Sequence, residues 1–145
     1  MSLTKVTYSM IKGMVGNSQD FANLVDAFAV YSCVDVTADI TLTANLTIPG
    51  NGKLFSSNNS KTAGFGINQT NNDVTIEGLR FNCTGNGGAL TVIQLSCNGA
   101  LVTNNQFFEN TGGVSYDIVI GGLRNSVIAN DFTGTPSQGL VGVSG

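Results

Sequence analysis

One short pattern occurs three times between positions 72 and 132, and no other feature limits the fold as strongly. The copies are residues 74–81, 100–107 and 126–132. Their aligned positions hold apolar side chains (Ile76, Val102, Ile128), turn-forming residues (Gly78, Asn104, Asn130) and aromatic rings (Phe81, Phe107, Phe132). Aligned residues are 26 apart (102−76) or 25 apart (132−107). Such repeats are typical of solenoids, because one repeat cannot bury its apolar face without a neighbour.

Each repeat contains further strand-like segments. Apolar and polar residues alternate in residues 89–96, and the same places are occupied 25 residues later in residues 114–120. This period of two indicates β-strands, and Gly, Asn, Ser and Thr separate them as turn residues. We therefore predict an all-β fold, a parallel β-helix with about 25–26 residues per coil, in which the Ile76 and Phe81 positions begin two interior columns.

The turn-forming positions support this winding. Gly78, Asn104 and Asn130 fall where one strand must bend into the next. Glycine and asparagine enter the left-handed backbone region more easily than other residues. Stacked asparagine side chains can also hydrogen-bond to one another along the axis of such a stack. We expect an aligned column of bends here.

The N-terminal part precedes the repeats and is predicted to be different. Residues 1–17 form a lead-in, and residues 18–145 form the β-helix, which includes a helix within residues 18–32. Asn17 or Ser18 can cap the start of that helix. An apolar stripe then follows at helical spacing, namely Phe21, Leu24, Val25 and Phe28. A helix with an apolar face would cover the open end of the stack, and the alternative is a helix that binds a partner.

The period changes to two after Cys33. Apolar residues alternate with polar ones in residues 39–48, a turn follows at 49–52, a strand resumes at 53–55 and a polar loop occupies 56–63. At the other end, Val141 and Val143 would open another coil that has no room to finish. The C-terminal end of the stack is therefore predicted to be uncovered, so the chain either self-associates or is an incomplete part of a longer β-helix.

Composition and charge exclude several classes of function. The net charge is −3 and no basic run occurs, which argues against a nucleic-acid partner. No apolar segment is long enough to span a membrane. The chain has no histidine, so a Ser–His–Asp site is excluded. Cys33, Cys83 and Cys97 lack metal-ligand spacing and are predicted to be free thiols. We predict neither a metal site nor a cofactor.

Glycosidic hydrolysis needs two carboxylates on either side of the scissile bond. The candidate catalytic residues are Glu109, Asp117 and Asp131. Asp117 is predicted to face outward, and Glu109 and Asp131 lie in adjacent coils, so their carboxylates can approach each other. The alternative is that all three are solvated surface carboxylates. A lyase base is less well supported, because neither Arg80 nor Arg124 is accompanied by a cluster of acidic residues.

Carbohydrate binding is better supported than catalysis. The outward columns consist of Thr, Asn, Gln and Ser with an occasional aromatic residue, a combination that suits sugars. The candidate binding residues are Gln106, Phe108 and Tyr116. The alternative is that any stacked β surface exposes Thr and Asn without binding anything.

Three segments resemble bacteriophage tailspikes. Residues 6–13 are similar to their short lead-in, and residues 39–50 and 74–81 are similar to the start of their right-handed, pectate-lyase-like parallel β-helix. The lead-in is shorter here, and family members have much longer β-helices with catalytic grooves farther along or between subunits. The resemblance implies a homotrimer in the virion tail, made in the host cytoplasm, that binds and often depolymerises a bacterial surface polysaccharide.

Three hypotheses for function follow. The first is a structural and recognition module of a phage tailspike or tail fibre. The second is a polysaccharide-degrading lyase or glycoside hydrolase, and the third is a bacterial surface adhesin with a similar β-helix.

Overall fold

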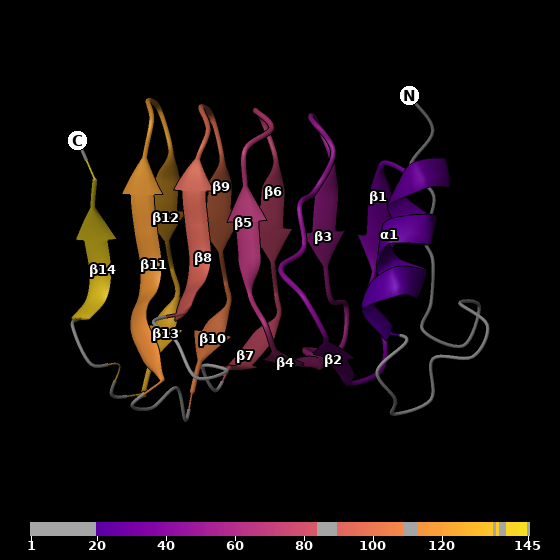
Figure 1. Cartoon of the computed structure of the whole chain (residues 1–145), viewed down its shortest axis with the longest axis horizontal. Coiled ribbons are helices and arrows are strands. Elements are labelled where there is room, and N and C mark those ends of the chain that lie inside the picture. Colours follow the sequence, from indigo (N-terminus) through magenta and orange to yellow (C-terminus); the bar gives the residue numbers. More distant parts are fainter. Residues whose placement is uncertain (1–19, 84–89, 109–112, 135, 137–138, 145) are drawn as a thin grey trace.

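The chain folds as a parallel β-solenoid with one short helix near its N-terminus. A computed structural model describes residues 20–83, 90–108, 113–134, 136 and 139–144. In Figure 1 the coils stack along the long axis, with the helix α1 (Asp20–Val30) at one end and the last strand at the other. Every pairing between strands is parallel, so each strand lies beside its counterpart in the next coil.

Three sheets run along the stack. The first sheet contains β1 (Cys33–Asp35), β3 (Lys53–Phe55), β6 (Thr75–Glu77), β9 (Leu101–Thr103) and β12 (Ser126–Ile128). The second contains β2 (Ile40–Leu42), β4 (Lys61–Gly64), β7 (Arg80–Cys83), β10 (Gln106–Phe107) and β13 (Asp131–Phe132). The third contains β5 (Ile67–Gln69), β8 (Leu90–Ser96), β11 (Val114–Gly121) and β14 (Gly139–Val143).

Coil length is not uniform. In the first sheet, Thr75 pairs with Leu101 and Leu101 with Ser126, so the later coils have the predicted 26 (101−75) and 25 (126−101) residues. The earlier coils are shorter, since Cys33 pairs with Lys53 (53−33 = 20) and Lys53 with Thr75 (75−53 = 22). The coils therefore also begin earlier than the repeats suggest, and β4 lies partly within the predicted polar loop.

Interior columns hold the coils together. Phe107 stacks between Phe81 and Phe132, with ring centroids 5.1 Å and 5.0 Å apart, which confirms the predicted aromatic column. The predicted column Ile76, Val102 and Ile128 is wrong at its third member. Val102 pairs with Val127, and Ile128 is 56% exposed. The step from Val102 to its partner in the last coil is 25 residues, as it is for the phenylalanines. Counting 26 residues instead reaches Ile128, one position past the interior residue Val127.

The two ends of the stack differ. Helix α1 packs against β1 and β2 and buries Leu24 and Phe28. The prediction that Val25 belongs to the buried stripe of this helix is wrong, since its side chain is 44% exposed. Ala27 is buried beside Leu24 and Phe28 instead. The lead-in, the capping candidates Asn17 and Ser18 and the side chain of Phe21 lie outside the described residues.

At the opposite end, β12, β13 and β14 are the last described strands of their sheets. Val143 is 82% exposed, so this end is uncovered among the described residues, as predicted. However, Val141 and Val143 do not open a further coil. They stack beneath Ile118 and Ile120 and complete the coil that contains β12 and β13.

Candidate functional site

The bend between the first and second sheets is where the chain presents its most distinctive surface. In the last three coils this bend consists of two residues, and the first of them has a left-handed backbone. These residues are Gly78, Asn104 and Ala129, with φ of 73°, 55° and 55°. The prediction of an aligned bend column is therefore correct for Gly78 and Asn104. It is wrong for Asn130, because the shorter last repeat moves Ala129 into that position.

On the inner side of the bend, asparagine side chains bind the backbone. The amide of Asn105 donates to the Ile76 carbonyl (3.0 Å), and its Oδ1 accepts the Leu79 N–H (3.0 Å). Asn130 repeats this one coil on, where Oδ1 accepts the Asn105 N–H (3.0 Å) and Nδ2 donates to the Val102 carbonyl (2.9 Å). Asn105 Nδ2 also donates to Asn130 Oδ1 (3.2 Å), so the predicted hydrogen bonding between stacked asparagine side chains exists, one residue farther along the chain than expected.

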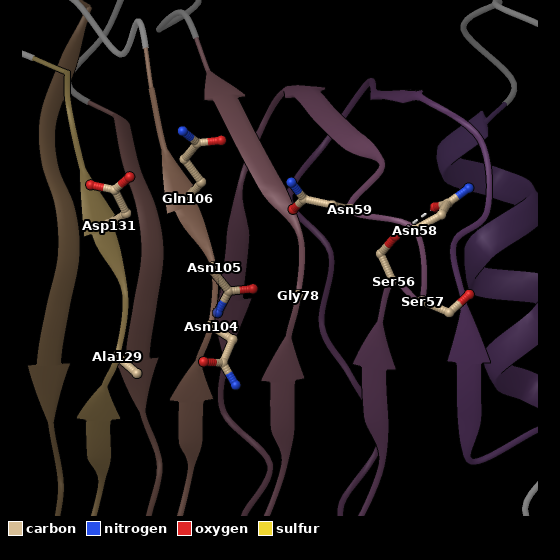
Figure 2. Close-up of a pocket in the computed structure, with 10 residues that line it drawn as sticks. All are labelled: Ser56, Ser57, Asn58, Asn59, Gly78, Asn104, Asn105, Gln106, Ala129 and Asp131. Carbon is tan, nitrogen blue, oxygen red and sulfur yellow. Dashed lines mark hydrogen bonds between the residues drawn. The ribbon is translucent and has the colours of Figure 1, made fainter.

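On the outer side of the same bend lies an open, polar hollow of about 540 Å³ (Figure 2). We call it the polar hollow, and it is lined by residues 56–59, Gly78, residues 104–106, Ala129 and Asp131. Its lining comes from four successive coils. Coils of a solenoid stack about 4.8 Å apart, so the polar hollow extends for roughly 14 Å along the axis.

A change in the length of the bend creates this hollow. The bend between β3 and β4 has five residues, 56–60, whereas the bends that follow have only two. The longer bend stands out from the surface and forms one wall. Gly78 lies next to it and has no side chain to fill the space. An added Cβ at Gly78 would meet the Ser56 carbonyl oxygen at 2.7 Å. Glycine at this position therefore permits the tight bend and leaves the hollow unfilled.

The wall formed by residues 56–60 is fixed by hydrogen bonds to the previous coil. Ser56 Oγ donates to the Val36 carbonyl (2.7 Å), and Asn58 Nδ2 donates to the Thr37 carbonyl (2.7 Å). The Ser57 N–H donates to the buried carboxylate of Asp35 (2.9 Å). A wall held in this way is preorganised, so ordering it would cost little on binding.

Four amide or carboxylate side chains of the polar hollow remain available to a ligand. Asn59, Asn104, Gln106 and Asp131 make no side-chain hydrogen bond to any described residue. Three of them are neutral amides, each with two donor hydrogens and an acceptor oxygen, and the fourth is a carboxylate that only accepts. Figure 2 shows them spread along the hollow from the 56–60 wall to the last coil.

The structure brings together two of the predicted site residues. Gln106 and Asp131 are direct partners in the pairing of β10 with β13, and both line the polar hollow. Phe108 follows β10 and is not part of the lining of the polar hollow. The Arg80 guanidinium lies 4.6 Å from the centre of its ring. Glu109 lies outside the described residues, so its approach to Asp131 stays a prediction.

The other two predicted site residues lie elsewhere. Tyr116 is on the third sheet, where its ring lies against the backbone of β14 at Gly139 and Gly142. Asp117 has an exposed fraction of 0%, so the prediction that it faces outward is wrong. Asp117 and its neighbour Ile118 are both buried, as are Val92 and Ile93 in the paired strand β8, so the alternation fails here in both strands. The charge of the Asp117 carboxylate acts on the interior thiol of Cys83.

The three cysteines are free and buried, as the predicted free thiols require. Burial raises the pKa of the Cys83 thiol to about 12, and the charge of Asp117 adds to this effect. Burial, with a smaller contribution from Asp73, also raises the pKa of Cys97. Both thiols are therefore held in the neutral, unreactive form at physiological pH.

The described lining of the polar hollow offers groups that can bind a polar ligand. Among the residues that the structure describes, Asp131 is the only carboxylate in its lining, and Glu77 is paired with Lys53 on the first sheet. Among the described residues no group of three His, Cys, Asp or Glu side chains could hold a metal ion. Over the same part of the chain, no helix is long and apolar enough to cross a membrane.

Sequence reasoning missed much of this site. Asn59 belongs to a segment that was expected to be a polar loop, and Asn104 was assigned only to a bend. The signal that could have found them is spacing, because the interval from Phe55 to Thr62 is longer than the equivalent interval from Glu77 to Phe81. Such a difference places a projecting segment beside a tight bend.

Comparisons of the chain with protein-family models, with curated proteins and with solved structures found no match.

Proposed function

We propose that this chain is a recognition module of a phage tailspike or tail fibre, and that it binds a bacterial surface polysaccharide in the polar hollow. The observation that carries the binding proposal is the set of free side chains at Asn59, Asn104, Gln106 and Asp131, held in a preformed surface depression. Sugars present many hydroxyl groups that both donate and accept, and amides match this property.

The shape of the site supports an elongated ligand. Its free polar groups come from three of its four coils, with Asn59 in the first, Asn104 and Gln106 in the third and Asp131 in the fourth, while the second coil contributes only Gly78. They therefore extend over roughly 14 Å along the axis, and only an elongated ligand lying parallel to that axis would meet all of them. A compact small molecule would use only part of the row, and for this reason a polysaccharide is favoured over a single metabolite.

The phage context rests on a different observation, the resemblance of residues 6–13, 39–50 and 74–81 to tailspikes. A location in the virion tail and a homotrimeric state are parts of this proposal. The parallel solenoid fits it, because tailspike receptor-binding regions are expected to have that architecture. The solution mass of the chain, measured by light scattering, tests the trimer directly.

An array of bacterial capsular and O-antigen polysaccharides tests the binding proposal. We expect one or a few members to bind, and we expect Asn104→Ala or Gln106→Ala to weaken binding by about fivefold each, the value of one hydrogen bond. The matched control is Asn68→Ala on β5, an exposed asparagine of the third sheet that should leave binding unchanged. Equal binding by all three variants would contradict a site in the polar hollow.

The same samples distinguish recognition from degradation. Size-exclusion chromatography of each bound polysaccharide after incubation measures chain shortening. Recognition without catalysis predicts no shortening. Shortening that is lost in Asp131→Asn or Glu109→Gln would establish the enzyme alternative in its place.

A further inference from the structure

A row of charged residues lies beside the polar hollow on the outer face of the second sheet. Lys61 pairs with Arg80, Arg80 with Gln106, and Gln106 with Asp131. The residues that follow them in the strands, Thr62, Phe81 and Phe107, are buried, so the members of the row point outward. Two cationic side chains are therefore neighbours in adjacent coils, and the next two members of the row line the polar hollow.

These two cations have no acidic partner among the described residues. Lys53, by contrast, is paired with Glu77 on the first sheet. Neither Lys61 nor Arg80 forms an ion pair with a described side chain. In a chain whose net charge is −3, two adjacent cations with no ion-pair partner in the described part of the chain make a local positive patch. The patch adjoins a site built mainly from neutral amides, with the Asp131 carboxylate at its far end.

Arg80 is also held in position. Its guanidinium lies 4.6 Å from the centre of the Phe108 ring, an arrangement in which the aromatic face attracts the cation. Stacking of this kind leaves the N–H groups at the edge of the guanidinium free to donate. Arginine in this state binds carboxylate or phosphate with two parallel hydrogen bonds and loses less side-chain freedom than an unsupported arginine would.

We infer that the polar hollow recognises an acidic polysaccharide, and that Arg80 and Lys61 bind a carboxylate or phosphate group of its repeating unit. This inference rests on the proposed function and adds a charge requirement to it. The amides of Asn104 and Gln106 would contact hydroxyl groups of the same chain. Phe108, with one face covered by Arg80, supports the guanidinium.

A carboxylate lies at each end of the row. Asp131 is its last member, and the carboxylate of Asp39, one coil before Lys61, accepts the Lys61 backbone N–H (2.7 Å). An acidic group is attracted at Lys61 and Arg80 and repelled at both ends, by Asp39 and by Asp131. The ligand should therefore place its acidic group over the cationic pair, and neutral hydroxyls over the later coils.

The test compares acidic oligosaccharides with their own neutral derivatives. The probes are oligosaccharides of alginate, hyaluronan and polysialic acid, each used as prepared and after reduction of its carboxylates to alcohols. Any polysaccharide that binds on the array is added in both forms. Binding is followed through backbone amide resonances of the folded chain, so that both its strength and its location are measured.

The inference predicts that an acidic form shifts resonances around Arg80 and Gln106, and that its reduced form binds at least about fivefold more weakly, since a charge-assisted hydrogen bond is lost. Added salt should weaken the acidic form alone. Equal binding of the two forms would overturn the charge requirement and leave the proposed function intact. A complete absence of binding by all probes would overturn both.

Single substitutions test which residues cause the preference for the acidic ligand. Arg80→Gln and Lys61→Gln should each reduce the preference for the acidic form, and Asp131→Asn should strengthen acidic binding by removing a repulsive charge. Arg124→Gln, at an exposed arginine on the bend between the third and first sheets, is the matched control for loss of one positive charge. If Arg80→Gln lowers the unfolding midpoint, Lys61→Gln and the salt dependence carry the test. An unchanged preference in both cationic variants would overturn the assignment.

Discussion

The two sides of the bend between the first and second sheets use similar residues for opposite purposes. Asn105 and Asn130 point inward and complete the hydrogen bonding of the backbone. Asn104 and Gln106, the immediate neighbours of Asn105, face outward into the polar hollow and make no side-chain hydrogen bond to the described residues. The same amide chemistry is therefore structural on one side and available for recognition on the other.

The largest expected effect is on the inner side, at the aromatic column. Phe107 stacks on a ring both above and below and is fully buried. Phe107→Ala would remove both contacts and leave a cavity, so we expect a loss of about 3–5 kcal/mol in the free energy of unfolding. Urea denaturation followed by circular dichroism measures it. A loss below about 1 kcal/mol would mean that the column does not hold the later coils together.

The next effect is expected at the inner amide. Asn105→Ala would leave the Leu79 N–H and the Ile76 carbonyl without their partners in a buried place. Each unsatisfied buried group costs about 1–3 kcal/mol, so the total loss should exceed about 2 kcal/mol. The same denaturation experiment on Asn104→Ala is the control. Equal losses in the two variants would remove the distinction between the two sides of the bend.

The interior thiol gives a pH-dependent prediction. The pKa of Cys83 in the folded chain is about 12, above its ordinary value of 9.0, so the folded state retains a proton that the unfolded state releases. Its contribution to stability is therefore complete below about pH 9 and is lost as the pH rises towards about 12, at up to about 1.4 kcal/mol per pH unit.

Comparison with Cys83→Ala isolates this contribution, because the other groups titrate in both proteins. The urea midpoint of the parent chain should fall more steeply with alkaline pH than that of the variant. Parallel curves would contradict a buried, neutral thiol at this position.

The smallest stability effects are expected on the outer side. Asn104→Ala retains the left-handed bend, which Ala129 already adopts with φ of 55°, so it should cost about 1 kcal/mol or less. Gln106→Ala should change the free energy of unfolding by no more than about 0.5 kcal/mol. Both should nevertheless weaken polysaccharide binding, and a variant that loses stability and keeps binding would reverse the assignment of the two sides.

The fold could be predicted from the sequence because a solenoid repeats its constraints. The phenylalanine spacing defines the coil, and period-two segments define its strands, so the stack of parallel strands follows from both. The alignment of the third repeat failed because the 26-residue spacing of Ile76 and Val102 was extended to Ile128. The 25-residue step from Phe107 to Phe132 applies to the whole of that repeat, and it would have placed Val127 inside.

The site was less predictable, for physical reasons that differ between residues. Gln106 and Asp131 are direct partners in adjacent coils, a relation that depends only on register and that the 25-residue step between these coils gives directly. Asp117 was placed outside by alternation with Ile118, but two consecutive residues are buried at this point in both β11 (Asp117 and Ile118) and β8 (Val92 and Ile93), so alternation does not apply there. The polar hollow could not be derived from any one repeat, since it depends on the difference between two unequal bends.

The unequal bends also suggest how such a surface can evolve. The polar hollow begins where the projecting segment 56–60 ends, and beyond it the bends of successive coils are alike. Duplication of one later coil would insert another copy of the bend and lengthen the depression by about 4.8 Å without moving its wall. The wall at residues 56–60 would stay in place, and the number of coils beyond it would set the length of polymer that the depression can bind.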